Sequence, residues 1–272
     1  MTASHADRVF AGSIPQLYER YLVPLIFEPY ADDLVERVRA IAPARVLEIA
    51  AGTGVVTRRL AAVLVPDTSI MATDLNPPML EHARALGTAR PVDWQQADAM
   101  ALPFADQSFD AVVCQFGVMF FPDRATAFAE ARRVLRPGGT LLFNVWDRLE
   151  ANDFADTVTA GLAGRYPADP PRFLARTPHG YCDIAAIARD VAQGGFAARA
   201  AVDTVARRSR ADAPSAPAIA YCQGTPLRGE IEARDACGLA AATEQAAQAI
   251  ARRFGPGPVE GGIRAHVVTV VR

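Results

Sequence analysis

Hydrophobic residues in the first half of the chain follow two alternating periods. Short apolar runs with the length of buried strands recur at 45–49, 70–73, 94–96, 109–115 and 141–146. Amphipathic stretches with helical spacing lie between them, at 55–64, 77–86 and 124–135. Strands separated by helices predict a parallel sheet with right-handed crossovers. A helical stripe also runs through 17–41, where we expect the prolines at 24 and 29 to break the helix.

The alternation stops after Trp146 and then resumes. A proline-rich stretch of about thirty residues follows, which is too long for an ordinary connection and predicts an insertion above the sheet. A helix at 184–192, a strand at 201–206, helices between 216 and 254 and a last strand at 263–271 complete the pattern. We therefore expect one domain in four parts: an N-terminal helical lid (1–44), a sheet core (45–146), the insertion (147–182), and the rest of the sheet (183–272) with a helical cap at 207–255.

Composition narrows the function. The chain has 272 residues and 28 basic against 30 acidic side chains, so no basic excess favours nucleic acid as a partner. Every basic residue is arginine, which excludes Schiff-base and P-loop lysine chemistry. The four cysteines form no CxxC pair, so we expect neither a metal site nor disulfides, and no apolar run is long enough to span a membrane. These features favour a cytoplasmic protein.

Polar residues follow each predicted strand at the edge where an open parallel sheet binds its ligand. In chain order they are Gly52 with Gly54, Asp74, Asp98, Gln115 and Asp147. Asp74 lies 20 residues beyond Gly54, a separation at which a carboxylate after the second strand can accept hydrogen bonds from ribose hydroxyls. The alternative is that Asp74 caps the helix that begins after Asn76.

Two nucleoside cofactors fit this pattern. A dinucleotide favours G-x-G-x-x-G, but Thr57 stands at the position of the third glycine, and Glu48 would place a carboxylate near the pyrophosphate. S-adenosylmethionine instead carries an ammonium and a sulfonium, beside which a carboxylate is favourable. The charges therefore favour the methyl donor.

Four motifs in order resemble the class I S-adenosylmethionine-dependent methyltransferases, in the branch that contains quinone C-methyltransferases and many small-molecule methyltransferases. They are VLEIAAGTG at 46–54, ATDLNPPML at 72–80, ADAMALPF at 97–104 with SFD at 108–110, and RVLRPGGT at 133–140. Ala50 departs from the usual E-x-G-x-G-x-G pattern by replacing its first glycine. We expect its methyl group to narrow the pocket without abolishing binding.

The resemblance implies an α/β fold, a Rossmann-like three-layer sandwich with a seven-stranded, mostly parallel sheet. The last strand would insert antiparallel beside the fifth. The cofactor would be S-adenosylmethionine, with S-adenosylhomocysteine as product, and the acceptor a small molecule with an oxygen, nitrogen or carbon nucleophile. On this reading 45–146 binds the cofactor and 147–182 caps the acceptor, in a monomer or homodimer.

The resemblance also implies roles for individual residues. Those that would bind the cofactor are Tyr21, Glu48, Ala50, Gly52, Asp74, Leu75, Met79, Asp98, Ala99, Gln115 and Phe116. Of these, Glu48, Ala50 and Gly52 would line the methionine portion and Asp74 would hold the ribose. Leu75 and Met79 would flank the adenine, Asp98 and Ala99 would bind its edge, and Gln115 and Phe116 would lie near the transferred methyl group. Tyr21 and, with less weight, Tyr18 resemble lid tyrosines that close over the methionine end.

An acceptor must lose a proton during methyl transfer, and His179 and Asp147 are our candidates for the base. Tyr181 and His266 are further candidates, and Arg172 and Arg176 are candidates for binding an anionic acceptor. The acceptor pocket should be built from 148–182, 216–228 and the N-terminal helix. Two alternatives stay open, a nicotinamide-dependent oxidoreductase and a non-catalytic protein that only binds the cofactor.

Overall fold

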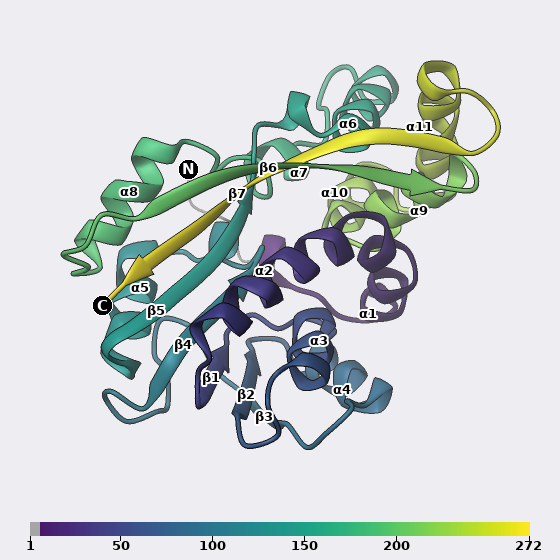
Figure 1. The fold of residues 1–272 in the computed structure, drawn as a ribbon. Helices are drawn as coiled ribbons and strands as arrows, with labels where there is room; N and C mark the ends of the chain where they lie inside the picture. Colours follow the sequence, from purple (N-terminus) through teal and green to yellow (C-terminus); the bar gives the residue numbers. More distant parts are fainter. Residues whose placement is uncertain (1–5) are drawn as a thin grey trace.

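The computed structural model of the protein describes residues 6–272 and places seven strands in one sheet (Figure 1). The strand order is β3-β2-β1-β4-β5-β7-β6. Every strand runs parallel to the others except β7, which is antiparallel to both β5 and β6. This arrangement confirms the predicted Rossmann-like fold and the insertion of the last strand beside the fifth.

The structure fixes the bounds of each element. The strands are β1 (Arg45–Glu48), β2 (Ser69–Asp74), β3 (Asp93–Gln96), β4 (Phe109–Gln115), β5 (Leu135–Trp146), β6 (Ala201–Ala211) and β7 (Val259–Val271). The helices up to β5 are η1 (Ala6–Arg8), α1 (Ile14–Leu17), η2 (Tyr18–Phe27), α2 (Glu28–Ile41), α3 (Val55–Val63), α4 (Pro77–Leu86), η3 (Val118–Phe120) and α5 (Arg124–Val134). The later helices are η4 (Leu149–Ala151), α6 (Asp153–Arg165), α7 (Phe173–Arg176), α8 (Ile184–Gln193), α9 (Ser215–Gln223), α10 (Leu227–Arg234) and α11 (Leu239–Phe254).

The connections from β1 run in opposite directions across the sheet. β1, β2 and β3 step one way through α3 and α4, whereas β4 and β5 step the other way through α5. Right-handed crossovers that run in opposite directions place their helices on opposite faces, so α3 and α5 cover different sides. The carboxyl ends of β1 and β4 therefore border the crevice where such a sheet binds its ligand.

The N-terminal helical segment differs from its prediction. It is continuous from Ile14 to Ile41, through α1, η2 and α2, and neither proline breaks it. Pro24 lies inside η2, whose turns are π-helical, and Pro29 lies at the start of α2, where the helix changes from π to α. Residues 1–5 of the predicted lid lie outside the described residues.

The last two strands are longer than predicted. β6 extends to Ala211 and β7 begins at Val259, so 207–211 of the predicted cap region belong to a strand. The first cap helix, α9, begins at Ser215, one residue before the predicted start of the helices. Beyond the end of β5, the two strands pair only with each other and pass over η2. There Ser209 Oγ donates a hydrogen bond to the Leu25 carbonyl. This ribbon holds the N-terminal helix above the sheet.

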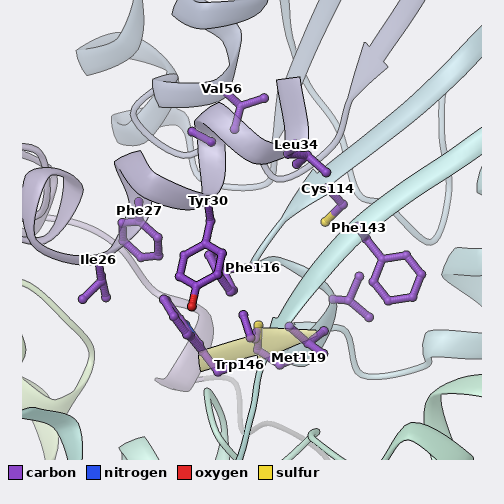
Figure 2. Close-up of a cluster of buried hydrophobic side chains, with 14 of the residues drawn as sticks. Ile26, Phe27, Tyr30, Leu34, Val56, Cys114, Phe116, Met119, Phe143 and Trp146 are labelled. Carbon is purple, nitrogen blue, oxygen red and sulfur yellow. The ribbon is translucent and has the colours of Figure 1, made fainter. Parts of the chain in front are cut away.

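Aromatic side chains fill the space between η2, α2 and the carboxyl ends of β4 and β5 (Figure 2). Phe116 and Trp146 stack with ring centroids 3.8 Å apart, and Tyr30 meets both rings edge-on. Tyr30 is fully buried, and its hydroxyl donates to the Val205 carbonyl on β6. This cluster fixes the N-terminal helix against the part of the sheet where the candidate site lies.

Candidate functional site

The turn after β1 has a backbone that favours glycine. Gly52 and Gly54 have φ of +58° and +83°, and Ala50 has φ of +55°. A Cβ on Gly54 would lie 3.0 Å from the Trp94 ring, so the turn packs closely against the neighbouring βα unit. The left-handed conformation costs an alanine roughly 1–2 kcal/mol, which makes Ala50 a strained position in the turn.

A cavity of about 760 Å³ opens above this turn. Its wall combines residues from the ends of β1, β2 and β4, from the loop after β3, and from the N-terminal segment. Nine of the predicted cofactor residues lie on it, namely Ala50, Gly52, Asp74, Leu75, Met79, Asp98, Ala99, Gln115 and Phe116. Two predicted residues, Glu48 and Tyr21, are not part of this wall.

Asp74 both lines this first cavity and holds the turn. Its Oδ2 accepts a hydrogen bond from the Gly52 N–H at 2.8 Å, and its Oδ1 accepts one from the Asn76 N–H at 2.8 Å. Burial raises the pKa of Asp74, and these backbone N–H groups oppose the shift. A carboxylate has about four acceptor sites, so Asp74 can hold the turn and still accept hydrogen bonds from a ligand.

Glu48 lies beneath the turn. It is 1% exposed, and its Oε2 accepts a hydrogen bond from Thr57 Oγ1 at 2.5 Å. Burial raises the pKa of Glu48 to about 8, so the side chain holds a proton at neutral pH. Glu48 does not line the cavity, whose carboxylates are Asp74 and Asp98, and its place beside the methionine portion stays a prediction.

Two residues at the end of β4 carry unusual features. The Oε1 of Gln115 is buried without a hydrogen-bond partner among the residues that the structure describes. Phe116 has φ of +51°, and its N–H donates to Asn144 Oδ1 at 2.9 Å, which holds this strained conformation. An orphaned acceptor and backbone strain on one cavity wall are features of ligand-binding sites.

The N-terminal segment supplies wall residues that the sequence analysis missed or weighed low. Arg8, Phe10 and Tyr18 line the cavity, whereas Tyr21 does not. A π-helical turn holds more residues than the 3.6 of an α-helix, so the two tyrosines diverge further than their i, i+3 spacing predicts. Arg8 and Phe10 lie in a short polar stretch with no periodicity, so no sequence signal pointed to them.

A second cavity, of about 560 Å³, adjoins the first. Four side chains line both cavities, namely Phe10, Tyr18, Phe116 and Phe120. Trp146, at the end of β5, also lines it. The rest of its wall comes from the three segments that we expected above the strand ends, namely Leu22, Ile26, Phe27, Asn152, Phe173, Leu174, Pro178, His179, Tyr221 and Thr225. Two cavities that share a wall of four aromatic rings can bring two ligands side by side.

Comparisons with known proteins agree with this geometry. Residues 47–143 match the family model described as a methyltransferase domain. An uncharacterized protein of Mycobacterium tuberculosis is 35% identical over 149 residues, which cover 54% of this chain and 51% of that protein. A ubiquinone/menaquinone biosynthesis C-methyltransferase of Ectopseudomonas mendocina is 29% identical over 202 residues, covering 69% of this chain and 74% of that protein. The chain therefore contains a methyltransferase domain at 47–143 and resembles the class I S-adenosylmethionine-dependent methyltransferases, including the quinone C-methyltransferases.

Solved structures support the fold. A Haemonchus contortus N-methyltransferase, in complex with phosphomonomethylethanolamine and S-adenosylhomocysteine, superposes with a TM-score of 0.57 at 18% identity. The match covers 98% of this chain and 59% of that one. The chain spans about half the length of the first curated relatives that it matches.

His179 is the candidate base that the structure places on a cavity wall. It is 7% exposed, and its Nδ1 lies 2.8 Å from the Asp147 carbonyl. A carbonyl only accepts, so Nδ1 carries the proton and Nε2 keeps a free lone pair. Burial lowers the pKa of His179 to about 4, so the ring is neutral at physiological pH. The arrangement fixes one tautomer of a neutral imidazole on the wall of the second cavity.

Asp147, our other candidate base, lines neither cavity. Its Oδ2 accepts a hydrogen bond from Arg264 Nε at 2.5 Å, and its Oδ1 accepts one from the Arg148 N–H at 2.6 Å. Although burial alone would raise the pKa of Asp147, these contacts hold it below its usual value. The residue acts on the site through its backbone carbonyl, which orients His179.

The remaining candidates of the sequence analysis have structural partners. Tyr181 donates to Asp190 Oδ2 at 2.7 Å, and His266 Nδ1 lies 3.0 Å from Thr204 Oγ1. Arg176 pairs with Asp7 and Glu230, away from both cavity walls, and Arg172 lies on neither wall. These contacts leave His179 as the candidate base.

Residues 6–272 contain neither a cluster of metal ligands nor a membrane-spanning helix. No group of three or more His, Cys, Asp or Glu side chains in this range is placed to hold a metal ion. No helix in the same range is long and apolar enough to cross a membrane.

Proposed function

We propose that this chain transfers a methyl group from S-adenosylmethionine, bound in the first cavity, to a small molecule bound in the second. The observation that carries the proposal is the wall of Phe10, Tyr18, Phe116 and Phe120, which both cavities share. Methyl transfer is an in-line displacement that mainly needs alignment, close contact and exclusion of water. Two adjoining cavities behind aromatic side chains meet those needs.

The residues of the first cavity fit this cofactor. Asp74 would accept hydrogen bonds from the ribose hydroxyls while it holds the turn. Leu75 and Met79 would contact the adenine faces, and Asp98 would accept from the adenine edge. The orphaned Gln115 Oε1 would accept from the ammonium of the methionine portion. When bound, the cofactor supplies an activated methyl group on a positively charged sulfur.

The family match favours this activity over a nicotinamide-dependent reaction, which rests only on the shared βα turn and Asp74. The relative from Ectopseudomonas mendocina is named for methylation in quinone biosynthesis, and we infer a small-molecule acceptor here too. In this account residues 1–44 form the lid, 45–146 bind the cofactor and 147–182 help to enclose the acceptor. A cytoplasmic location, a monomeric or homodimeric state and the absence of a nucleic-acid partner stay predictions from the sequence.

Equilibrium dialysis with labelled S-adenosylhomocysteine tests the proposed site. Asp74→Asn should weaken binding by tenfold or more, because an amide replaces one ribose-accepting oxygen by a donor. The matched control is Asp203→Asn, which changes an acidic side chain that is 60% exposed on the edge strand β6 and should bind like the wild type. Equal binding by both variants would remove Asp74 from the cofactor site. Binding of the cofactor without methyl transfer to any acceptor would favour the non-catalytic alternative.

A further inference from the structure

Among residues 6–272, no charged side chain lines the second cavity. Eight of its fifteen lining residues are Phe, Tyr or Trp, and none is Arg, Asp or Glu. A charged ligand that leaves water needs a partner of opposite charge, because the cost of desolvation is otherwise several kcal/mol or more. The cavity therefore selects an uncharged acceptor with an extensive apolar surface.

The arginines at 172 and 176, near wall residues in the sequence, do not change this conclusion. Arg176 donates from both Nε and Nη2 to the Asp7 carboxylate, and Nη2 also donates to Glu230. These bonds hold the guanidinium in a network that joins the N-terminal segment to α7 and α10. Arg172 lies outside the wall. No guanidinium in the part of the chain that the structure describes faces this cavity.

Most polar groups of the wall already have partners. Asn152 donates from Nδ2 to three backbone carbonyls and accepts the Arg264 N–H at Oδ1. Thr225 Oγ1 donates to the Tyr221 carbonyl and accepts the Leu227 N–H. On the wall of this cavity, three polar side-chain groups have no hydrogen-bond partner among residues 6–272: the hydroxyls of Tyr18 and Tyr221 and the Nε2 of His179. Of these three groups, only His179 Nε2 is an obligate acceptor, because the other ring nitrogen holds the proton.

We propose that the acceptor is an uncharged phenol whose hydroxyl donates to His179 Nε2 and whose oxygen receives the methyl group. This proposal rests on the proposed methyltransferase function and names its substrate class. Aromatic walls complement a planar ring, and a single obligate acceptor among apolar groups matches a single hydroxyl donor.

Three other classes of acceptor fit this cavity less well. An aliphatic amine is a cation at neutral pH, as lysine is, and would find no carboxylate on the wall. A carboxylic acid is an anion and would find no guanidinium. An aliphatic hydroxyl is far less acidic than a phenol, whose pKa of about 10 in tyrosine is the lowest of the common uncharged hydroxyls.

The transfer balances with the groups on this wall. A lone pair of the phenol oxygen forms the new bond to the methyl carbon, and the carbon–sulfur bond breaks with its electron pair returning to sulfur. The positive sulfonium becomes a neutral thioether, and the hydroxyl proton passes to His179 Nε2. The oxygen becomes strongly acidic as the new bond forms, so even this weakly basic imidazole accepts the proton. The imidazolium then loses its proton to water after the product leaves.

The test compares three probes of similar size: 2-naphthol, 6-hydroxy-2-naphthoate and 1-naphthylmethylamine. Each is titrated into the protein saturated with S-adenosylhomocysteine, and each is then incubated with labelled S-adenosylmethionine. We expect 2-naphthol to bind at least tenfold more tightly than the two charged probes and to yield 2-methoxynaphthalene. His179→Gln keeps an acceptor oxygen but cannot take up a proton, so kcat should fall by about 100-fold or more with a small change in KM. His82→Gln on α4, outside both cavities, is the matched control and should keep the wild-type kcat.

Several results would overturn the proposal while leaving the proposed function intact. These are equal binding of a charged probe, methylation on a ring carbon, and an unchanged kcat in His179→Gln. Failure of a panel of one-ring and two-ring uncharged phenols to bind the S-adenosylhomocysteine-loaded protein would also overturn it. Failure of S-adenosylhomocysteine itself to bind would instead contradict the proposed function.

Discussion

The contact between Ala50 and Gly117 gives a quantitative test of how the cofactor turn is packed. A Cβ added to Gly117 would lie 2.5 Å from the Ala50 Cβ and 2.8 Å from Cys114 Sγ. The backbone of Gly117 has φ of −98°, which alanine adopts freely. In the folded state Gly117→Ala therefore changes only the packing around this position. The methyl group of Ala50, where the family pattern has glycine, is thus accommodated because position 117 has no side chain.

The expected magnitude follows from that clash. Overpacking a tight site lowers the free energy of unfolding by about 1–3 kcal/mol. Replacing glycine also reduces the conformational entropy of the unfolded chain, which raises that free energy by about 0.4–1 kcal/mol. Gly117→Ala should therefore lower the free energy of unfolding by about 1–2 kcal/mol. Ala50→Gly removes the shorter contact, so the double variant should regain about 1 kcal/mol beyond the sum of the single changes.

Urea unfolding of the wild type, both single variants and the double variant measures this coupling energy. The m-values should stay equal, so that the midpoints report stability alone. Additivity of the two changes within about 0.3 kcal/mol would show that the contact is not made, and would refute our explanation of how this chain tolerates alanine at position 50.

Three further predictions concern charged and titratable groups. Asp74→Ala should lower the free energy of unfolding by about 2–4 kcal/mol, because the Gly52 and Asn76 N–H groups lose their acceptor. Asp74→Asn should lower it by less, and urea unfolding of both variants measures the difference. Burial lowers the pKa of His179 from 6.5 to about 4, so the unfolded chain alone takes up this proton as the pH falls. Through this group stability should drop by about 3 kcal/mol between pH 7 and pH 4, a component that is absent in His179→Gln. Asp7→Asn should cost about 2 kcal/mol by breaking the buried pair with Arg176, and a calorimetric melting temperature equal to that of the wild type would contradict this.

The sequence pattern predicted the sheet core well and its later elements less well. α4 and β4 begin and end at the predicted residues, 77–86 and 109–115, because each has one clear period and clear turn residues at its ends. β6 was predicted five residues too short, because its outer part is an arginine-rich, solvent-exposed edge that pairs only with β7. The π-helical η2 was predicted as a broken helix. In the sequence, a proline at 24 looks the same whether the helix ends there or continues as a π-helix.

The candidate site was also predicted only in part. Residues that follow strands β1 to β4 could be predicted, because parallel strands bring their carboxyl ends to one edge. Glu48 and Asp147 also lie at strand ends, but their carboxyl groups accept hydrogen bonds from Thr57 and Arg264. Such partners come from elements far apart in the sequence, so no local pattern reveals them. The orientation of His179 by a backbone carbonyl has no sequence signal at all.

The most direct test of the central claim is a calorimetric titration of the wild-type protein with S-adenosylhomocysteine, with NADH titrated under the same conditions. The account predicts saturable binding of one S-adenosylhomocysteine per chain with a Kd in the micromolar range, and no binding of NADH. Binding of NADH without binding of S-adenosylhomocysteine would contradict the account.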